Sequence, residues 1–359
     1  MRYMHSGWAP VRHQARLAVF VALCLSLTLV AADPSVAAAA CKVTNAARGG
    51  TYKSLGAAVK AARNGNTLAV RGTCLGSTQI SNKRLTVVGK WSRDYGVPTL
   101  RGNGRETVLT VGGDSARVTV EKLTIRAKPD RVLRRGGAGI SNVIATLVLR
   151  DVTVKGFKTR EGGGGIANVE GTVRLLGTTK VVNNESTERG GGGIYNNSGT
   201  VMLGDQALVA NNTAREGGGI DSVGSSAVLV LKGTSSVRGN TATGYGGGGI
   251  LADHGRVTLS GDASISGNTT SQYGGGYAGS GVLTMAGGAS ISDNSAETGG
   301  GVYSGGDIVM TTTNSVTGNT AIGYAGGVDH SYGSRSGVVC YPEPDANVFG
   351  NSPGDCNLD

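Results

Sequence analysis

The amino-acid sequence predicts an all-β fold, a right-handed parallel β-helix solenoid with a short N-terminal capping helix. The first observation behind this prediction is a glycine cluster followed by an apolar residue, which recurs eight times at intervals of 25 to 30 residues. The second is an aliphatic residue followed three positions later by Asn, a motif that recurs in step with the first. Short apolar stretches such as Val257-Thr258-Leu259 lie between the two motifs. Repeats of this length, with strand-like pieces separated by turn residues, are typical of solenoids.

Each period is expected to form one coil of three short strands. Each strand then pairs in parallel with its equivalent one coil, or roughly 4.8 Å, further along. The glycines suit a corner where φ is positive or where coils approach closely. The apolar residue that follows the glycine cluster is, in chain order, Ile140, Ile166, Ile194, Ile220, Ile250, Tyr277, Val302 and Val328.

The recurrent Asn is predicted to have a structural role. At the same corner of every coil, its side-chain amide can hydrogen-bond to the Asn above and below it and to backbone groups of the turn. A leucine-rich repeat, a propeller blade and a calcium-binding nonapeptide repeat are excluded because their motifs or periods are absent. The predicted Asn ladder consists of Asn184, Asn212, Asn240, Asn268, Asn294 and Asn319, and Asn351 follows after an irregular gap.

Residues 1–40 read as a signal peptide. A basic start that contains Arg2, Arg12 and Arg16 precedes the apolar run Leu17 to Val30, and small residues follow up to Ala40. The run is shorter than the roughly 20 residues that a membrane span needs, and no later segment is long or apolar enough to span one. We therefore expect cleavage just before Cys41 and a secreted or extracellular protein; acylation of Cys41 is the alternative.

The mature chain is expected to have three parts. Residues 41–135 form the N-terminal cap and the first coils, residues 136–335 the regular repeats, and residues 336–359 a C-terminal disulfide cap. Within the first part, apolar residues between Ser54 and Arg63 fall on one helical face, with Ser54 as N-cap and Asn64-Gly65 as the stop. A short helix here would cover the open end of the solenoid.

Five cysteines are present, and Cys24 lies within the signal peptide. The remaining four fall as one pair near each end, which predicts the disulfides Cys41–Cys74 and Cys340–Cys356 in an exported chain. The two other pairings would tie opposite ends of a long rod together. A metal site is disfavoured because no C-x-x-C motif is present.

Charge is unevenly distributed along the chain. Residues 41–135 carry 19 Lys and Arg against five Asp and Glu, a net charge of +14, whereas residues 136–359 carry a net charge of −6. The basic part suggests attraction to an anionic polymer, and the alternative is a solvated basic edge. Nucleic acid is not expected as a partner, because of export and because aromatic residues are not interleaved with the basic ones.

The two motifs together resemble the repeats of polymorphic outer membrane proteins, which belong to the pectin-lyase-like set of right-handed β-helices. The resemblance covers roughly Gly136 to Asn351, although the family repeat often has Phe where this chain has Val or Ile. It implies a fold that polysaccharide lyases, glycoside hydrolases, adhesins and proteins without known activity share. The fold by itself does not choose among these functions.

Acidic residues at equivalent positions of neighbouring coils are the candidates for catalysis. Asp221 and Asp253 fall on successive coils, and His254 could join them. A hydrolase would need two or three such carboxylates, and a lyase would need a Ca²⁺-binding carboxylate cluster. Asp329 and His330 lie three coils from Asp253, roughly 14 Å away, too far to share one site. The alternative is that all these residues are solvated turn residues.

Tyrosines just before the glycine clusters are the candidates for ligand binding. Tyr245 and Tyr273 fall on successive coils, and Tyr324 occupies the same place further on. Flat aromatic rings with a polar tip suit sugar rings. The alternative is that each Tyr covers the exposed backbone of the glycine corner.

The leading hypothesis is a non-enzymatic protein that binds cell-wall or extracellular glycan, or an adhesin-like rod. The competing hypothesis is a carbohydrate-active enzyme, lyase or hydrolase, that uses Asp221, Asp253 and His254. The third is a structural protein of the cell surface. No cofactor is expected, apart from Ca²⁺ in a lyase, and the sequence leaves the oligomeric state open.

Overall fold

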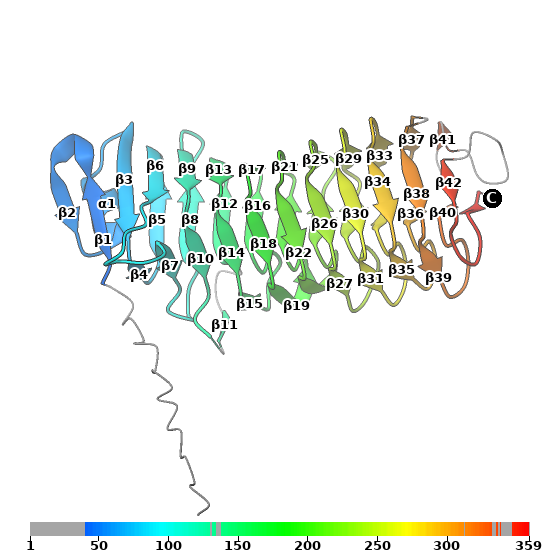
Figure 1. Ribbon diagram of the computed structural model, residues 1–359, viewed down its shortest axis with the longest axis horizontal. Helices are drawn as coiled ribbons and strands as arrows, with labels where there is room; N and C mark the ends of the chain where they lie inside the picture. Colours follow the sequence, from blue (N-terminus) through cyan, green and yellow to red (C-terminus); the bar gives the residue numbers. More distant parts are fainter. Residues whose placement is uncertain are drawn as a thin grey trace, which may run out of the picture. The chain divides into compact units, whose positions relative to one another are not determined.

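The chain forms a parallel β-solenoid in the computed structural model (Figure 1). The structure describes residues 40–129, 131–133, 138–311, 313–331, 335–336, 338 and 347–358. Apart from Ala40, the predicted signal peptide lies outside the described residues. No helix in the described part of the chain is both long and apolar enough to cross a membrane.

Four sheets, here called I to IV, run along the solenoid, and the strands of each are given in spatial order. Sheet I contains β2 (Gly50–Tyr52), β1 (Lys42–Asn45), β3 (Asn66–Arg71), β6 (Arg84–Gly89), β9 (Arg117–Glu121), β13 (Thr146–Arg150), β17 (Thr172–Leu176), β21 (Thr200–Leu203), β25 (Val228–Leu231), β29 (Arg256–Leu259), β33 (Val282–Met285), β37 (Ile308–Met310) and β41 (Arg335–Ser336). Sheet II contains β4 (Thr73–Leu75), β7 (Thr99–Arg101), β10 (Thr124–Arg126), β14 (Thr153–Lys155), β18 (Lys180–Val182), β22 (Leu208–Ala210), β26 (Ser236–Arg238), β30 (Ser264–Ser266), β34 (Ser290–Ser292), β38 (Ser315–Thr317) and β42 (Val348–Phe349). Sheet III contains β11 (Val132–Leu133), β15 (Lys158–Thr159), β19 (Glu185–Gly190), β23 (Thr213–Glu216), β27 (Thr241–Ala242), β31 (Thr269–Thr270), β35 (Ser295–Ala296) and β39 (Thr320–Ala321). Sheet IV contains β43 (Cys356–Asn357), β40 (Val328–His330), β36 (Val302–Ser304), β32 (Tyr277–Gly279), β28 (Ile250–Asp253), β24 (Ile220–Val223), β20 (Ile194–Asn197), β16 (Ile166–Val169), β12 (Ile140–Val143), β8 (Leu109–Gly112) and β5 (Thr78–Ser81).

A regular coil has four strands, one from each sheet in the order IV, I, II and III, and the glycine cluster then leads back to sheet IV. The expectation of three strands per coil is therefore wrong. The missed strand is the one in sheet III, where six of the eight described strands, such as β27, are only two residues long. A strand this short shows no alternation of apolar and polar residues, so the pattern could not reveal it.

Equivalent residues of successive coils stack directly on one another. Ile166, Ile194, Ile220 and Ile250 pair in register through sheet IV, and each is fully buried. Because side chains alternate between the two faces of a strand, every second residue of each coil enters the core. The core is thus a set of aliphatic ladders that run the length of the solenoid.

The Asn motif forms the ladder that joins sheets II and III. Asn240 shows the pattern: its Oδ1 accepts hydrogen bonds from the backbone N–H of Asn212 at 2.9 Å and from Asn212 Nδ2 at 3.0 Å. Its own Nδ2 donates to Asn268 Oδ1 at 2.9 Å and to the Val209 carbonyl at 3.1 Å. The ladder includes Asn184, Asn212, Asn240, Asn268, Asn294, Asn319 and Asn351, and it ends on the carboxylate of Asp355.

The glycine cluster leaves room for this ladder. A Cβ at Gly219 would lie 2.6 Å from the Gly249 carbonyl oxygen and 2.8 Å from Asn240 Nδ2, closer than any real side chain approaches. The preceding corner residue Gly217 has a φ of +52°, which favours glycine for conformational reasons. The two sequence motifs therefore recur in step because they contact each other in space.

A second, shorter Asn ladder lies in sheet IV and was not predicted. Asn142 donates to Asn168 at 2.8 Å, Asn168 donates to Asn196 at 2.8 Å, and Asn196 donates to the Ser222 hydroxyl at 3.0 Å. The same amides also donate to the carbonyls of Ala145, Gly171 and Gly199 at the next corner. The signal was available, because Asn follows the anchor isoleucine by two positions in three consecutive repeats.

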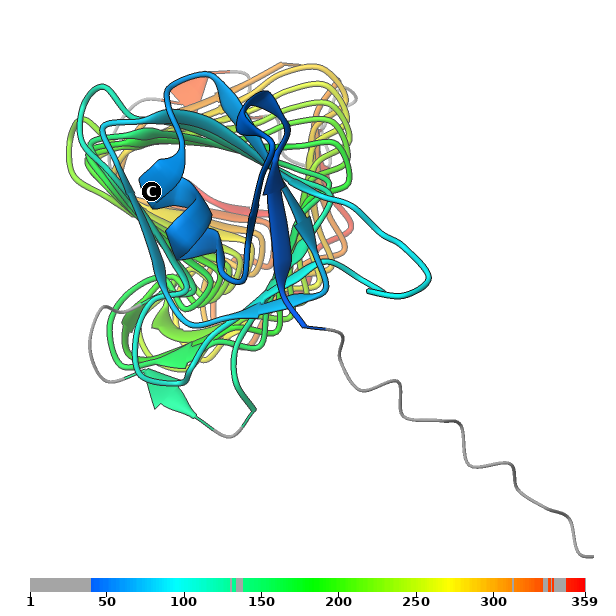
Figure 2. The ribbon, with the colours of Figure 1, turned by 90° about the vertical axis from the view of Figure 1, so that its left-hand side faces the viewer.

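Helix α1 (Leu55–Ala61) lies across the end of the coils that faces the viewer in Figure 2. The Ser54 hydroxyl accepts a hydrogen bond from the Ala57 N–H at 3.2 Å, and Leu55, Ala58 and Val59 enter the core. The helix ends before the predicted Asn64-Gly65 stop. Lys83 Nζ, from the next coil, donates to the Val59 and Ala62 carbonyls at 2.7 and 2.9 Å, which satisfies carbonyl groups at the C-terminal end of the helix.

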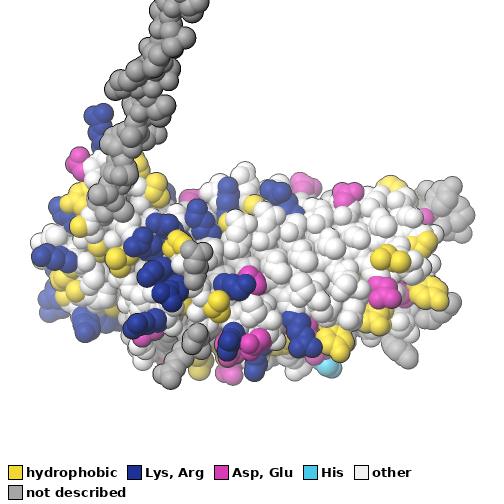
Figure 3. Space-filling model, turned by 90° about the horizontal axis from the view of Figure 1, so that it is seen from below, with side chains coloured by type: hydrophobic (Ala, Val, Ile, Leu, Met, Phe, Trp, Pro, Cys, Tyr) yellow, Lys and Arg dark blue, Asp and Glu magenta, His cyan; other side chains and the backbone are white. Residues whose placement is uncertain are grey.

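The surface charge follows the uneven distribution along the chain. Figure 3 shows Lys and Arg side chains gathered over the N-terminal half of the face that it displays, whereas uncharged side chains dominate further along. Because successive coils lie side by side along one axis, a bias in sequence becomes a bias along the solenoid.

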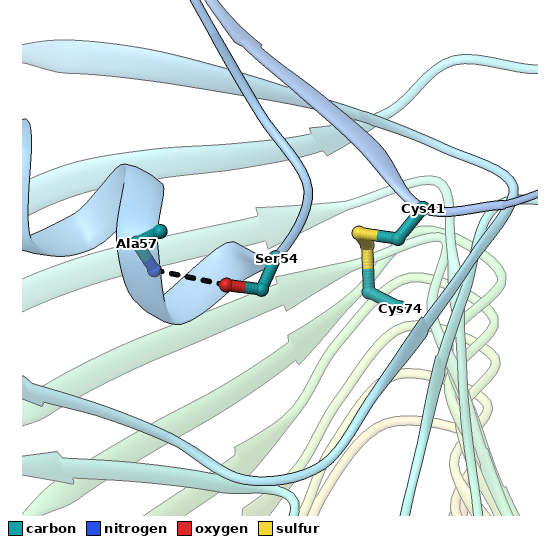
Figure 4. The surroundings of a disulfide bond; sticks show 4 residues. All are labelled: Cys41, Ser54, Ala57 and Cys74. Carbon is teal, nitrogen blue, oxygen red and sulfur yellow. Dashed lines mark hydrogen bonds between the residues drawn. A yellow bond between two sulfur atoms is a disulfide. The ribbon is translucent and has the colours of Figure 1, made fainter.

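The Cys41–Cys74 disulfide is confirmed and joins the start of β1 to β4 (Figure 4). The two cysteines are 33 residues apart, and closing a loop of this length stabilises the folded chain by about 3–4 kcal/mol in the loop-entropy treatment. Cys356 is also a disulfide cysteine, whereas its predicted partner Cys340 lies outside the described residues.

Replacing the central ladder residue, Asn240→Leu, is expected to lower the free energy of unfolding by about 3 kcal/mol. The two donors of Asn212 and the Val209 carbonyl lose their partner inside the protein, and each buried unpaired group costs about 1–3 kcal/mol. The control is Asn197→Leu, on the partly exposed outer side of β20. Thermal and urea unfolding followed by circular dichroism measures the difference, and equal stability of the two variants would contradict the role of the ladder.

Candidate functional site

A groove of about 340 Å³ lies on the outer face of sheet IV, alongside the loops that follow sheet III. It spans strands β24, β28, β32 and β36. Ala278 is the outward residue of β32 and is small, whereas the residues in the same register position on β28 and β36, Leu251 and Tyr303, are large. The groove therefore runs on the outer surface, parallel to the solenoid axis. Regular coils form it, and no extra loop is inserted between them in the described part of the chain.

Tyrosine rings form much of the groove wall. Tyr245 and Tyr273, from successive coils, are 57% and 42% exposed, and Tyr303 on β36 also lines the groove. The ring centroids of Tyr273 and Tyr303 are 4.7 Å apart with an interplanar angle of 33°. The Arg215 guanidinium lies 5.9 Å from the centre of the Tyr245 ring. The structure therefore brings two of the three predicted tyrosines into one site.

Tyr324 is not among the residues that line this groove, although 71% of it is exposed. The intermediate coil has Thr298 at the position that Tyr273 and Tyr324 occupy, so the aromatic column is interrupted. Sequence reasoning missed Tyr303, which follows the anchor residue Val302 and therefore points outward from sheet IV. That position in the repeat was the available signal.

Asp253 provides a carboxylate in the groove. It lies at the end of β28, and its Oδ1 accepts a hydrogen bond from the Ser280 hydroxyl at 2.8 Å. The same oxygen lies 2.6 Å from His254 Nδ1, and the two side chains are 54% and 70% exposed. His254 has a φ of +64° and occupies the corner that Gly224 occupies one coil earlier. Glu216 adds a second carboxylate to the lining.

Asp221 has a different environment from Asp253, although both point outward from successive strands of sheet IV. Asp221 pairs with Leu251 and Asp253 with Val223, so one diagonal step of the sheet separates them. Asp221 is only 3% exposed and does not line the groove. Its carboxylate fills the space left by the missing side chain of Gly190, where a Cβ would overlap it.

Burial, together with the smaller effect of the negative charges of Glu216 and Asp253, raises the pKa of Asp221 to about 8. Among the described residues, no hydrogen-bond donor reaches its Oδ1. The side chain is therefore mostly protonated at neutral pH. The structure thus holds a neutral carboxylic acid next to the groove and two carboxylates within it.

Asp329 and His330 form hydrogen-bond contacts within the C-terminal coils. The Asp329 carboxylate accepts a hydrogen bond from Asn357 Nδ2 at 3.2 Å, and burial raises its pKa. His330 Nε2 lies 3.0 Å from the Gly306 carbonyl oxygen inside the solenoid. Neither residue lines the groove. Within the described ranges, no group of three or more His, Cys, Asp and Glu side chains is placed to hold a metal ion.

Comparisons with protein-family models, with curated proteins and with solved structures found no match. The parallel solenoid agrees with the coarse part of the predicted resemblance, the β-helix.

Stability is expected to depend on pH through Asp221. The unfolded side chain releases its proton near pH 3.8, whereas the folded one holds it until about pH 8. The folded protein therefore binds more protons between these values, and its free energy of unfolding falls as the pH rises through this window, at up to about 1.4 kcal/mol per pH unit. Asp221→Asn removes this dependence, so its Tm relative to the wild type should increase from pH 5 to pH 8.

The comparison uses thermal unfolding at several pH values, with Asp253→Asn as the matched carboxylate control. The Tm difference between the control and the wild type is expected to change less with pH. If Asp221→Asn follows the pH profile of the wild type, the folded carboxyl group is not held in its protonated form.

Proposed function

We propose that the groove binds a glycan chain and that the protein is a non-catalytic, glycan-binding β-solenoid. The observation that carries this proposal is the grouping of Tyr245, Tyr273 and Tyr303 along one axial hollow. Aromatic faces pack against the C–H surfaces of sugar rings, while polar groups at the edges bond to hydroxyls. Asp253, Glu216 and Ser280 are the polar groups within reach of such a ligand.

The groove suits a linear polymer. It extends over four successive strands of sheet IV, and three steps between neighbouring strands cover roughly 14 Å. A chain of sugars laid along the solenoid axis would therefore meet tyrosines from different coils. Because Tyr245, Tyr273 and Tyr303 come from three successive coils, a longer oligosaccharide meets more of these rings, and affinity is expected to grow with length over this span.

The charge of the groove favours a neutral glycan. Glu216 and Asp253 are the two charged residues among those that line it, and the Arg215 guanidinium lies over the Tyr245 ring. An acidic sugar would bring its own carboxylate towards these two, which costs free energy. Neutral sugars can donate hydroxyl hydrogen bonds to both carboxylates instead.

We also propose that this binding takes place outside the cytoplasm, with the protein secreted or held at the cell surface. The signal-like residues 1–40 support export, and so does the Cys41–Cys74 disulfide, because disulfides persist in oxidising compartments.

Glycan hydrolysis is the second candidate function, and one observation favours it. Glycoside hydrolases pair a protonated carboxylic acid with a second carboxyl group, and the raised pKa of Asp221 provides such an acid near Asp253 and Glu216. The burial of Asp221 argues against this candidate, because a general acid must reach the glycosidic oxygen. For this reason, we rank binding first.

Removing the ring of Tyr245 or Tyr273 is expected to weaken glycan binding about tenfold, which corresponds to about 1.4 kcal/mol. Tyr245→Ala and Tyr273→Ala, in the mature protein (residues 41–359), would be compared by calorimetry against a panel of neutral oligosaccharides of increasing length. Tyr324→Ala removes an even more exposed ring outside the groove and should bind like the wild type. Equal losses in all three variants would place the binding site elsewhere.

The same preparations can test the hydrolytic alternative. We expect no release of reducing ends or unsaturated products from neutral or acidic polysaccharides, with or without Ca²⁺. Release that persists in the wild type and disappears in both Asp253→Asn and Asp221→Asn would replace the binding proposal with an enzymatic one.

A further inference from the structure

Three basic side chains form a column on the outer face of sheet II. The column belongs to coils that precede those of the tyrosine groove. Arg101, Arg126 and Lys155 occupy the same register position on β7, β10 and β14. Neighbouring members are therefore one strand spacing, roughly 4.8 Å, apart. Leu75 precedes this column and Val182 follows it, so the column is confined to three coils.

A second group of cations extends this column. A pocket of about 270 Å³ is lined by Asn103, Gly104, Arg105, Lys128 and Arg131, and it contains no acidic side chain. Lys128 lies two residues beyond Arg126 of the column. Asn103 Oδ1 accepts hydrogen bonds from the N–H groups of Arg105 and Glu106 at 2.8 and 3.2 Å, which holds this loop in place. We call the six basic residues of the column and the pocket the basic strip: Arg101, Arg105, Arg126, Lys128, Arg131 and Lys155.

The positive charge of the basic strip is not compensated within the described part of the chain. Ion pairs there involve the basic residues Arg150, Lys158, Arg160 and Arg189, together with the His254–Asp253 contact, and none belongs to the strip. The Glu106 carboxylate, next to Arg105, instead accepts a hydrogen bond from the Ser77 hydroxyl at 2.9 Å. Arg101 Nε is buried, and no hydrogen-bond partner reaches it from the described residues.

Like charges directly opposite one another in a sheet repel, so this column costs free energy in the isolated protein. An anion on the strip would remove that repulsion and would supply acceptors for the guanidinium groups, which pair well with carboxylate, sulfate and phosphate.

We propose that the basic strip is a second binding site, separate from the tyrosine groove, and that it holds an acidic polysaccharide laid along the solenoid axis. A single column of cations with regular spacing matches a linear polymer that carries a charge on each repeating unit. A membrane surface would instead meet a broad basic or amphipathic face. Sites for single-stranded nucleic acid interleave aromatic platforms with the cations, and no aromatic residue is a member of the strip or lines its pocket.

The test uses the mature protein and three probes: polygalacturonate, dextran sulfate and uncharged dextran. Both acidic polymers should bind, and the dissociation constant should rise steeply with salt concentration because polyanion binding releases counterions. The triple variant Arg101→Gln/Arg126→Gln/Lys155→Gln should bind at least tenfold more weakly. Its slope of log Kd against log salt should decrease by about two to three, in line with the loss of three charge contacts.

The matched control is Lys53→Gln/Lys60→Gln/Lys90→Gln, which removes the same net charge at exposed positions outside the strip. It should keep the affinity and salt slope of the wild type, and circular dichroism verifies the fold of both triple variants. An equal loss in the control would show that net charge alone attracts the polymer and would overturn the proposal.

Two other outcomes would also overturn it: failure of both acidic polymers to bind at low salt, and tighter binding of anionic phospholipid vesicles or single-stranded DNA. Because the variants leave Tyr245 and Tyr273 unchanged, loss of acidic-polymer binding would leave binding of neutral glycan to the groove intact. The two proposals can therefore fail independently.

Discussion

The hydrogen bonds between equivalent corner residues of successive coils hold the other features of the solenoid in place. Each inner ladder Asn accepts two hydrogen bonds from the Asn of one neighbouring coil and donates to the Asn of the other, as Asn240 does with Asn212 and Asn268. At this corner the backbone turns, and the Asn side chain supplies hydrogen bonds between coils in place of the backbone pairing of a sheet. Such a buried amide tolerates no shift in register, because its partners would lose their bonds. The glycine before each sheet IV anchor gives the amide room, and the aliphatic ladders then stack in the core.

A solenoid of this kind builds binding surfaces by changing outward residues while keeping inward ones. Leu251, Ala278 and Tyr303 occupy one register position on successive strands, and their different sizes shape the groove. Arg101, Arg126 and Lys155 occupy one register position in sheet II, and there the repetition produces a column of charge. Both features run along the axis because parallel pairing in register places equivalent residues side by side. An elongated ligand is the kind of partner that suits both of them.

The two aspartates on successive strands show how much of a site depends on its immediate neighbours. Asp221 and Asp253 have similar places in their repeats, and their outward direction follows from the alternation of a strand. Asp253 lies at the exposed end of β28 beside Ser280, whereas Asp221 fills the space beside Gly190 of the preceding coil. One is a surface carboxylate in a groove, and the other is a buried acid with a pKa of about 8. The difference arises from residues of neighbouring coils, more than 25 positions away in the chain.

The sequence by itself determined the repeat, the parallel stacking of coils, the Cys41–Cys74 pairing and the Ser54 N-cap of α1. The repeat and the stacking follow from the period, because each residue meets its own equivalent in the next coil. The disulfide and the helix start follow from local chemistry, namely the placement of the cysteines and the N-cap residue. Only the tertiary structure decided that a fourth strand closes each regular coil, that Tyr303 joins Tyr245 and Tyr273 while Tyr324 lies elsewhere, and that Asp221 is buried. Two-residue strands carry no periodic signal, and the exposure of an outward side chain depends on the size of its neighbours on adjacent coils and loops. Those neighbours become known only when the coils are stacked.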